Sequence, residues 1–247
     1  MTGERQHYSY TFYADKANAE AFDARRFGGP IGDLVAKGQA DVLAGMLGAI
    51  RGRSILDVGT GTGRAALLMA AAGASVTGVD ASAEMLAIAE HRAREAGRTI
   101  AFQVGDAHAL EFPAQSFDVA VSLRVLMHTP RWRQCIAELC RVARHAIVLD
   151  YPSATSSALP QSIARKGLHA IGRPTEPYRV FLDAQVRQEI EQHGFRVKAI
   201  HRQFVLPIAL HKAIGSAGFT QTSERWLARA GLLRLFGSPV TVYAERG

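Results

Sequence analysis

The sequence predicts an α/β fold, in which a mostly parallel sheet is covered by helices on both faces. Two observations carry this prediction. Short runs of β-branched and apolar residues alternate with segments of helical pattern, which is typical of a sheet covered on both sides. In addition, the first apolar run leads into the glycine-rich stretch 57–63, and such a loop between a strand and a helix is typical of nucleotide-binding α/β proteins.

The expected strands are short apolar runs bounded by turn-forming residues. In chain order they are Ser54–Val58, Ser75–Asp80, Ile100–Gly105, Phe117–Leu123, Ala146–Asp150, Phe195–Gln203 and Pro239–Ala244. The expected helices between them are Ala65–Ala72, Ala83–Ala96, Trp132–Val142 and Asp183–His193. Ser82 is a suitable N-cap for the second of these helices, Glu84 favours its first turn, and Gly97 is placed to end it.

The pattern changes after the fifth strand. Residues 153–181 contain several prolines and glycines, which predicts a lid-like insertion. The connection 205–238 is much longer than a hairpin loop and must hold at least one helix. Since no linker divides the chain, we expect one domain over 1–247, with an N-terminal helical cover (1–50), a cofactor-binding half (51–150) and a substrate-side half (151–247).

The glycine loop departs from the dinucleotide-binding pattern, because its third glycine arrives one residue early and Arg64 follows it. Asp57 stands at the strand end that a diphosphate would approach, and two negative groups repel each other at short range. A cofactor with a cationic amino-acid end and an adenosine end fits better. Asp57 would attract the cation and Asp80 would accept the ribose hydroxyls, as S-adenosylmethionine requires.

Four stretches in order resemble the motifs of the class I S-adenosylmethionine-dependent methyltransferases. They are 55–63, 79–82 with 85–86, 105–107, and 117–119 leading into 122–123. The resemblance covers roughly residues 50 to 150 and implies a Rossmann-like class I methyltransferase sandwich with seven strands in the order 3-2-1-4-5-7-6, the last two antiparallel, with added cap helices. It further implies methyl transfer with S-adenosylhomocysteine as product, in the small-molecule branch that includes quinone-biosynthesis methyltransferases.

The cofactor residues follow from the motifs and from this resemblance. They are Asp57, Gly59, Thr60, Gly61, Gly63, Asp80, Ala81, Met85, Asp106, Ala107, Ser122 and Leu123. Some of these residues have a purely structural alternative. The glycines could serve a tight turn, Asp80 could cap the next helix, and Met85 could be only a core residue of its helix, with no contact to the adenine. Asp106 is either an adenine-binding residue or a solvated loop acid.

The sequence gives fewer clues to the residues that bind the methyl acceptor. His128 follows the fourth strand and is the candidate general base, or it packs against the cofactor. Arg124 either binds an anionic acceptor or faces solvent. Tyr13 belongs to an aromatic cluster that either closes over a planar substrate or anchors an N-terminal helix. His211 either lines the acceptor pocket or lies on the surface.

The charge and composition of the chain do not determine its binding partner. The net charge of +7 and pI near 9.8 suit a phosphate backbone, but the basic residues are scattered, so a small-molecule acceptor is preferred over RNA. The basic, apolar segment 223–236 is a candidate for peripheral membrane contact. With a polar N-terminus and Cys135 and Cys140 as buried free thiols, we expect a cytoplasmic protein. No carboxylate cluster for a metal is evident, and the oligomeric state is left open.

Overall fold

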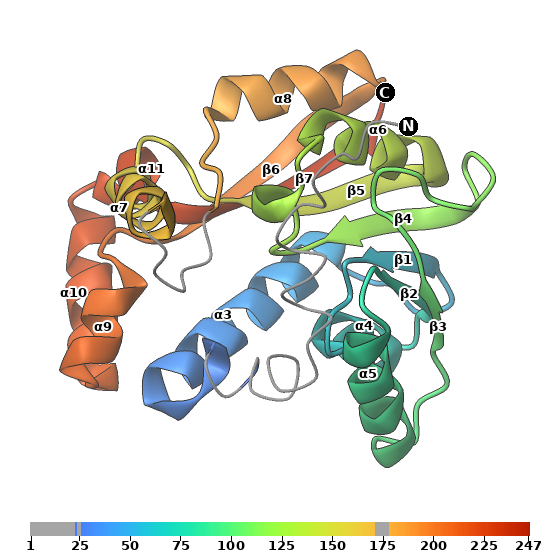
Figure 1. The fold of residues 1–247 in the computed structure, drawn as a ribbon, viewed down its shortest axis with the longest axis horizontal. Helices are drawn as coiled ribbons and strands as arrows, with labels where there is room; N and C mark the ends of the chain where they lie inside the picture. Colours follow the sequence, from blue (N-terminus) through green and yellow to red (C-terminus); the bar gives the residue numbers. More distant parts are fainter. Residues whose placement is uncertain (1–22, 24–25, 171–177) are drawn as a thin grey trace.

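The computed structural model describes residue 23, residues 26–170 and residues 178–247. Its sheet has seven strands in the order β3-β2-β1-β4-β5-β7-β6 (Figure 1). The first five strands are parallel, whereas β7 is antiparallel to both β5 and β6. The strands are β1 (Ser54–Val58), β2 (Ser75–Asp80), β3 (Ala101–Val104), β4 (Phe117–Ser122), β5 (Ala143–Tyr151), β6 (Phe195–Phe204) and β7 (Ser238–Arg246). The predicted fold class and strand order are confirmed.

Helices cover both faces of this sheet (Figure 1). The first face carries α3 (Gly29–Leu47), α4 (Arg64–Ala71) and α5 (Ala83–Glu95). The opposite face carries α6 (Trp132–Val142) and α8 (Asp183–Gln192), which pack on β4, β5 and β6. Because helices cover both faces, the central strands β1 and β4 are buried at every position but one.

Successive residues of one strand supply two separate cores. Leu56 and Val58 belong to the cluster beneath α6 and α8, while Ile55 belongs to the cluster beneath α3 and α4. This separation follows from the period of two along a strand. Cys135 and Cys140 of α6 are buried free thiols, as expected, and burial raises the pKa of each thiol to about 12.

Most predicted boundaries fall within a few residues of the observed ones. The Ser82 side chain accepts a hydrogen bond from the Met85 backbone N–H at 3.1 Å, which confirms the predicted N-cap of α5. The start of β5 was predicted too late, since α6 runs into β5 without a loop and Ala143 already pairs with Phe117 of β4. No turn residue marks that junction in the sequence.

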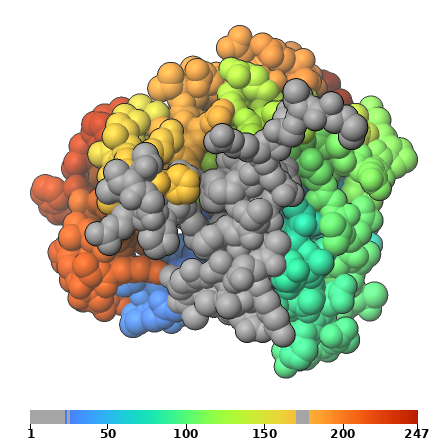
Figure 2. Space-filling view, in the orientation of Figure 1, coloured from blue at the N-terminus to red at the C-terminus, as the bar shows by residue number. Residues whose placement is uncertain are grey.

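Four further helices gather at one end of the molecule. They are α7 (Ala158–Ala170), α9 (Ile208–Ile214), α10 (Ala217–Arg229) and α11 (Leu232–Phe236). The space-filling view places the surfaces of α7, α9 and α10 together beside α3 (Figure 2). We refer to α7, α9, α10 and α11 as the cap helices. They fill the two segments that the sequence analysis assigned to a lid-like insertion and to a long helical connection.

The basic, apolar segment 223–236 is divided between two helices. α10 ends at Arg229, and Gly231, with φ +79°, precedes α11, so a single amphipathic helix does not form. The Trp226 side chain nevertheless remains 68% exposed. Membrane contact through this segment stays a prediction. None of the described helices has the length and apolar character needed to cross a bilayer.

His211 lies in neither of the two predicted settings. It is fully buried between α9 and α10 and is not among the described residues that line the cavities discussed below. Its ring nitrogens lie 2.9 Å from Glu224 Oε1 and 3.0 Å from Thr220 Oγ1. The Glu224 carboxylate also accepts the backbone N–H groups of Val205 and Leu206. The substrate and surface assignments are therefore wrong: His211 fastens the cap helices to the end of β6.

We expect His211→Ala to lower the free energy of unfolding by about 3 kcal/mol. The substitution removes one hydrogen-bond partner each from the buried Thr220 hydroxyl and from the largely buried Glu224 carboxylate. Denaturant unfolding monitored by circular dichroism measures this change. His91→Ala is the matched control, since the His91 side chain is 64% exposed and its loss should cost less than about 0.5 kcal/mol. Equal effects of the two substitutions would contradict a stabilising role for His211.

Candidate functional site

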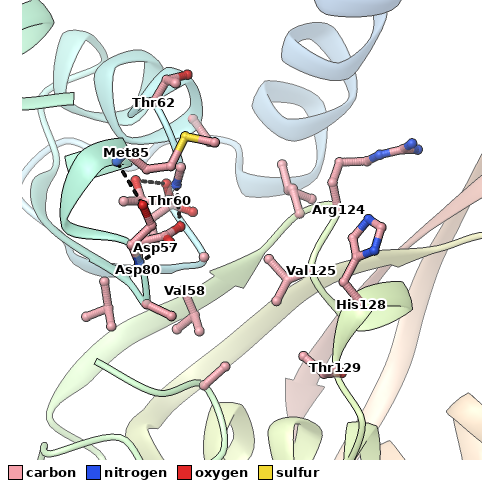
Figure 3. Close-up of a pocket in the computed structure, with 18 of the residues that line it drawn as sticks. Asp57, Val58, Thr60, Thr62, Asp80, Met85, Arg124, Val125, His128 and Thr129 are labelled. Atoms are coloured by element: carbon pink, nitrogen blue, oxygen red, sulfur yellow. Dashed lines mark hydrogen bonds between the residues drawn. The ribbon is translucent and has the colours of Figure 1, made fainter. Parts of the chain in front are cut away.

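A cavity of about 180 Å³ opens at the carboxyl ends of β1 to β4. Ligands of α/β sheets bind at this edge, where the strand order reverses. Figure 3 shows Asp57 and Asp80 on one side of the cavity and Arg124 and His128 on the other. The predicted cofactor residues that line it are Asp57, Gly59, Thr60, Gly61, Asp80, Ala81, Met85, Asp106, Ala107 and Leu123. We call it the donor cavity.

Two glycines form the floor of the donor cavity in conformations that favour glycine. Gly59 has φ +71° and Gly61 has φ +54°. A Cβ at Gly59 would lie 2.1 Å from Val125 Cγ2, so the loop and the segment after β4 are in close contact there. A Cβ at Gly61 would meet nothing within 4 Å, so the backbone at Gly61 faces open space that a ligand can approach.

Two predicted cofactor residues are not among the described residues that line the donor cavity. A Cβ at Gly63 would lie 2.9 Å from Ala89 Cβ, so this glycine allows α4 and α5 to pack closely. The Ser122 hydroxyl is buried and donates to the Val58 carbonyl at 3.1 Å, joining β4 to β1. In the described structure both residues thus pack elements that form the site, and their contact with the cofactor stays a prediction.

Asp57 supplies a buried carboxylate at the end of β1, with only 2% of the residue exposed. Its Oδ2 accepts a hydrogen bond from Thr60 Oγ1 at 2.7 Å. Burial raises the pKa of Asp57 from its ordinary value of 3.8 to about 6, and Asp80 contributes in the same direction while Thr60 opposes it. Asp57 is thus mostly ionised at neutral pH, although its charge is poorly solvated, and a cationic group in the cavity would compensate that charge.

Asp80 lies at the end of β2, and the loop holds its carboxylate in place. One oxygen accepts the Gly61 backbone N–H at 2.8 Å, and the other accepts the Ser82 backbone N–H at 3.0 Å. Burial raises the pKa of Asp80 despite these hydrogen bonds. Each carboxylate oxygen has a further lone pair, so the group can also accept hydroxyls from a ligand. The cap of α5 is made by the Ser82 side chain, not by Asp80.

Asp106, Ala107 and Met85 also line the donor cavity. Asp106 Oδ1 lies 2.7 Å from His108 Nδ1 and also accepts the His108 backbone N–H at 2.9 Å, so its carboxylate is oriented rather than freely solvated. Met85 is 2% exposed and lines the cavity from α5. It therefore serves both as a core residue and as part of the cavity wall.

A second cavity, of about 430 Å³, adjoins the donor cavity. The two cavities share the lining residues Arg26, Phe27, Gln39, Arg124 and His128. The second cavity reaches from there between α3, α7 and α9, and its size is typical of small-molecule sites. We call it the acceptor cavity. His128, which is 8% exposed, and Arg124 thus stand where the cavities meet, whereas Tyr13 lies outside the described residues.

Sequence reasoning missed several lining residues. Arg26, Phe27, Gln39, His108, Arg165 and Lys212 line one or both cavities. His108 could have been found, since it follows Asp106 and Ala107 directly. Arg64, which takes the place of a dinucleotide-binding glycine, has its guanidinium 3.9 Å from the Phe27 ring centroid. The other missed lining residues come from the segment before α3, from α3 itself and from the cap helices, where no motif marks them.

We expect Asp57→Asn to stabilise the ligand-free protein at pH 8 by about 2 to 3 kcal/mol, since it removes a poorly solvated charge. Because the pKa of Asp57 is raised to about 6, the folded chain binds this proton more tightly than the unfolded chain. The destabilising effect of this carboxylate therefore grows as the pH rises from about 4 through 6 and is absent below that range.

Thermal unfolding of the wild type and the variant at pH 4.5 and pH 8 measures this difference, which should be large only at pH 8. The control is Asp41→Asn, because the Asp41 side chain is 63% exposed and its substitution should have little effect at either pH. A stability gain of the same size at both pH values would contradict the assignment of a raised pKa to Asp57.

Comparison with known proteins finds a family match for the central region of the chain. Residues 55–146 match the family model for a methyltransferase domain. An uncharacterized protein of Mycobacterium tuberculosis is 34% identical over 149 residues, which are 60% of this chain and 52% of that protein. The ubiquinone biosynthesis O-methyltransferase of Methylococcus capsulatus is 30% identical over 139 residues, 54% of this chain and 59% of that protein.

A further relative, the 27-O-demethylrifamycin SV methyltransferase of Amycolatopsis mediterranei, is 40% identical over 108 residues, 42% of this chain and 39% of that protein. The chain thus spans about half the length of the curated relatives it matches.

The fold comparison covers more of the chain. The crystal structure of magnesium protoporphyrin IX methyltransferase from Synechocystis with bound S-adenosylhomocysteine (SAH) superposes with a TM-score of 0.67 at 17% identity, over 97% of this chain and 98% of that one. This similarity concerns the fold, and the family match concerns the residues that form the donor cavity. Residues 55–146 therefore match a methyltransferase domain, and the fold of the whole chain is similar to that of a methyltransferase crystallised with SAH.

Proposed function

We propose that this protein transfers a methyl group from S-adenosylmethionine to a small organic acceptor. The observation that carries the proposal is the buried carboxylate of Asp57 together with the half-buried carboxylate of Asp80, beside a glycine loop at the edge of the sheet. The two acids favour a ligand with a positive charge and disfavour a diphosphate. The open backbone at Gly61 leaves room for the ligand to lie against the loop.

The residues present fit this cofactor at each of its ends. Asp57, with Thr60 beside it, would hold the amino-acid end, and Asp80 would accept the ribose hydroxyls. Met85, Asp106 and Ala107 would surround the adenine. The bound cofactor supplies an electrophilic methyl group on a sulfonium, whose carbon–sulfur bond breaks with the electron pair remaining on sulfur. The residues of this chain hold the two reactants in line and exclude water.

His128 is the proposed general base for an acceptor that must lose a proton. What supports this role is its place where the donor and acceptor cavities meet. A histidine side chain can accept a proton near neutral pH. For an acceptor nitrogen that carries a free lone pair, no base would be needed, and His128 would act by packing alone.

The experiment that tests this function supplies methyl-labelled S-adenosylmethionine and the purified protein to a cell extract, followed by separation of lipid, RNA, protein and small-molecule fractions. We expect label in the small-molecule or lipid fraction. Label in RNA would replace the proposed acceptor class by RNA, which the net charge of +7 keeps as the alternative. If the protein bound the cofactor and no fraction were labelled, the result would favour a cofactor-binding protein without transfer activity.

A further inference from the structure

We infer that the outer face of the cap helices docks on a membrane surface that contains anionic lipids. Docking does not depend on the proposed function, because it concerns where the protein binds rather than what it methylates. It extends the membrane contact predicted for segment 223–236 to α7 and α9. Three features carry it: exposed apolar side chains, basic residues among them, and a single acidic residue in all four helices.

The exposed apolar side chains of the molecule are concentrated on the cap helices. Of the twelve large apolar side chains that are exposed among the described residues, nine belong to α7, α9, α10 and α11. Ile163 on α7 is 62% exposed, Trp226 on α10 is 68% exposed and Leu235 on α11 is 61% exposed. Scattered exposed apolar residues are ordinary, but a group of them at one end of a protein marks an interaction surface.

These helices lie next to one another in the folded chain. Figure 2 shows the surfaces of α7, α9 and α10 on the same side of the molecule. α11 packs against α10, and the Thr155 hydroxyl, just before α7, donates to the Leu235 carbonyl of α11 at 2.9 Å. We call their outer face the cap surface, defined by the apolar residues Ile163, Ile214, Trp226 and Leu235 and by the basic residues Lys166, Arg225, Arg229 and Arg234.

α7 separates a cavity face from an outer face. Ala158 and Gln161, three positions apart, line the acceptor cavity. Leu159, Ile163 and Lys166 are spaced by four and three positions, so they share another face of the helix, and all three are exposed. Neither Ile163 nor Lys166 is a lining residue of the donor or the acceptor cavity as described. The outer face of α7 is therefore available to a partner without disturbing either cavity.

α9 and α10 have the same arrangement. On α9, Leu210 and Ile214 are four positions apart and exposed, whereas His211 between them is fully buried. On α10, Arg225 and Arg229 are four positions apart, and Trp226 lies beside them on the exposed side of the helix. The cap surface thus combines aliphatic, aromatic and basic side chains, which is the composition of helices that lie in the plane of a bilayer interface.

The charge of the cap surface is positive. Lys166, Arg225, Arg229 and Arg234 are exposed, and within the described part of the chain none of their side chains forms an ion pair. The four cap helices contain one acidic residue, Glu224, whose side chain is only 11% exposed and lies against His211. An anionic membrane surface attracts basic side chains of this kind.

A bilayer fits this surface better than a second copy of the chain or an RNA. In a two-fold contact between copies, the same basic residues would face one another and repel. RNA would bind the basic residues through its phosphates but would leave Ile163, Ile214 and Leu235 in water. At a bilayer the lipid headgroups bind the basic residues, the acyl chains take up the aliphatic ones, and the Trp226 indole lies at the interface, where tryptophan is enriched.

Tryptophan fluorescence tests the docking directly. The chain has two tryptophans, of which Trp132 is 4% exposed, so a change in polarity at the surface is reported by Trp226. The full chain is titrated at physiological salt with vesicles of phosphatidylcholine alone and of phosphatidylcholine mixed equally with phosphatidylglycerol. We expect the mixed vesicles to bind about tenfold or more tightly and to shift the emission to the blue.

Three results of these titrations would overturn the inference. They are no binding to the mixed vesicles, equal binding to both kinds of vesicle, and binding without a shift of the emission. The last result would mean that another face of the protein meets the lipid.

Paired substitutions assign the binding to the cap surface. Ile163→Ser with Leu235→Ser keeps Trp226 as the probe and should weaken binding to the mixed vesicles about tenfold or more. Arg225→Gln with Arg229→Gln should reduce the preference for the anionic vesicles to about threefold or less. Full affinity and full preference in these variants would contradict docking by this surface.

Two control variants lie near the opposite edge of the sheet. Val104→Ser removes a 60% exposed apolar side chain of the edge strand β3, and Arg94→Gln removes an exposed charge of α5, which packs on β3. Both should bind the vesicles as the wild type does. None of the substituted residues is a described lining residue of either cavity, so every variant should bind SAH within about twofold of wild type, which also shows that it is folded.

The other occupants are tested with the same variants. A dimer in sedimentation velocity that Ile163→Ser with Leu235→Ser dissociates would replace the bilayer by a second copy. Tight binding of single-stranded RNA that Arg225→Gln with Arg229→Gln abolishes, with no vesicle binding, would replace it by RNA. Since none of these measurements requires methyl transfer, a failure of the proposed function would leave their outcome unchanged.

Discussion

Asp80→Ala should weaken the binding of SAH by about 100-fold or more. In our account the Asp80 carboxylate accepts both ribose hydroxyls, and each hydrogen bond to a charged group contributes about 1.5 to 3 kcal/mol. The substitution also frees the Gly61 and Ser82 backbone N–H groups that Asp80 now accepts, so the loop loses its fixed position. Isothermal titration calorimetry with SAH measures the loss.

Two comparisons separate the loss of ligand contact from damage to the fold. Asp80→Asn keeps one acceptor oxygen and the size of the side chain, so its affinity should lie between those of wild type and Asp80→Ala. Circular dichroism shows whether each variant remains folded. If folded Asp80→Ala bound SAH as tightly as wild type, the carboxylate would serve only to order the start of α5.

Gly59→Ala should lower the free energy of unfolding by about 3 kcal/mol or more and should abolish detectable SAH binding. The new Cβ would lie 2.1 Å from Val125 Cγ2, so the loop or the segment after β4 must move. The positive φ of +71° adds about 1 to 2 kcal/mol of strain for a residue with a side chain. Denaturant unfolding and calorimetry measure the two effects.

Gly97→Ala is the matched control, because Gly97 also has a positive φ, of +60°, but a Cβ there would meet nothing within 4 Å. It should cost only about 1 kcal/mol. Val125→Ala, which removes the clashing methyl groups, should recover about 1 kcal/mol or more when combined with Gly59→Ala. Strict additivity of the two substitutions would mean that contact with Val125 is not what requires a glycine at position 59.

The sequence predicted the sheet and the donor cavity well, since both depend on local patterns. The strand at Ser54–Val58, the glycine loop and Asp80 occur in one continuous stretch, and the parallel α/β topology brings them to the same edge. Asp57 was predicted to attract a cation, and its burial with a raised pKa is consistent with that role. For Gly63 the sequence could not show the close contact with Ala89 of α5, because a helix–helix contact and a ligand contact favour the same residue type.

The acceptor side could not be predicted to the same depth. Arg165 and Lys212 reach one cavity from helices that are far apart in the sequence, and only the packing of the cap helices brings them together. His211 looked like a surface or pocket residue because its partners, Thr220 and Glu224, lie on the next helix and carry no recognisable pattern. Tertiary contacts, rather than local sequence, determine these positions.

The central claim is that the carboxylates of Asp57 and Asp80, together with a glycine loop, select a cationic adenosine cofactor over a diphosphate one. Parallel calorimetric titrations of the full chain with S-adenosylmethionine and with NADH test it most directly. We predict binding of S-adenosylmethionine at one site and about 100-fold or more tightly than NADH, with affinity falling as the pH is lowered through 6, where Asp57 is protonated. Tight binding of NADH, together with no heat from S-adenosylmethionine, would contradict it.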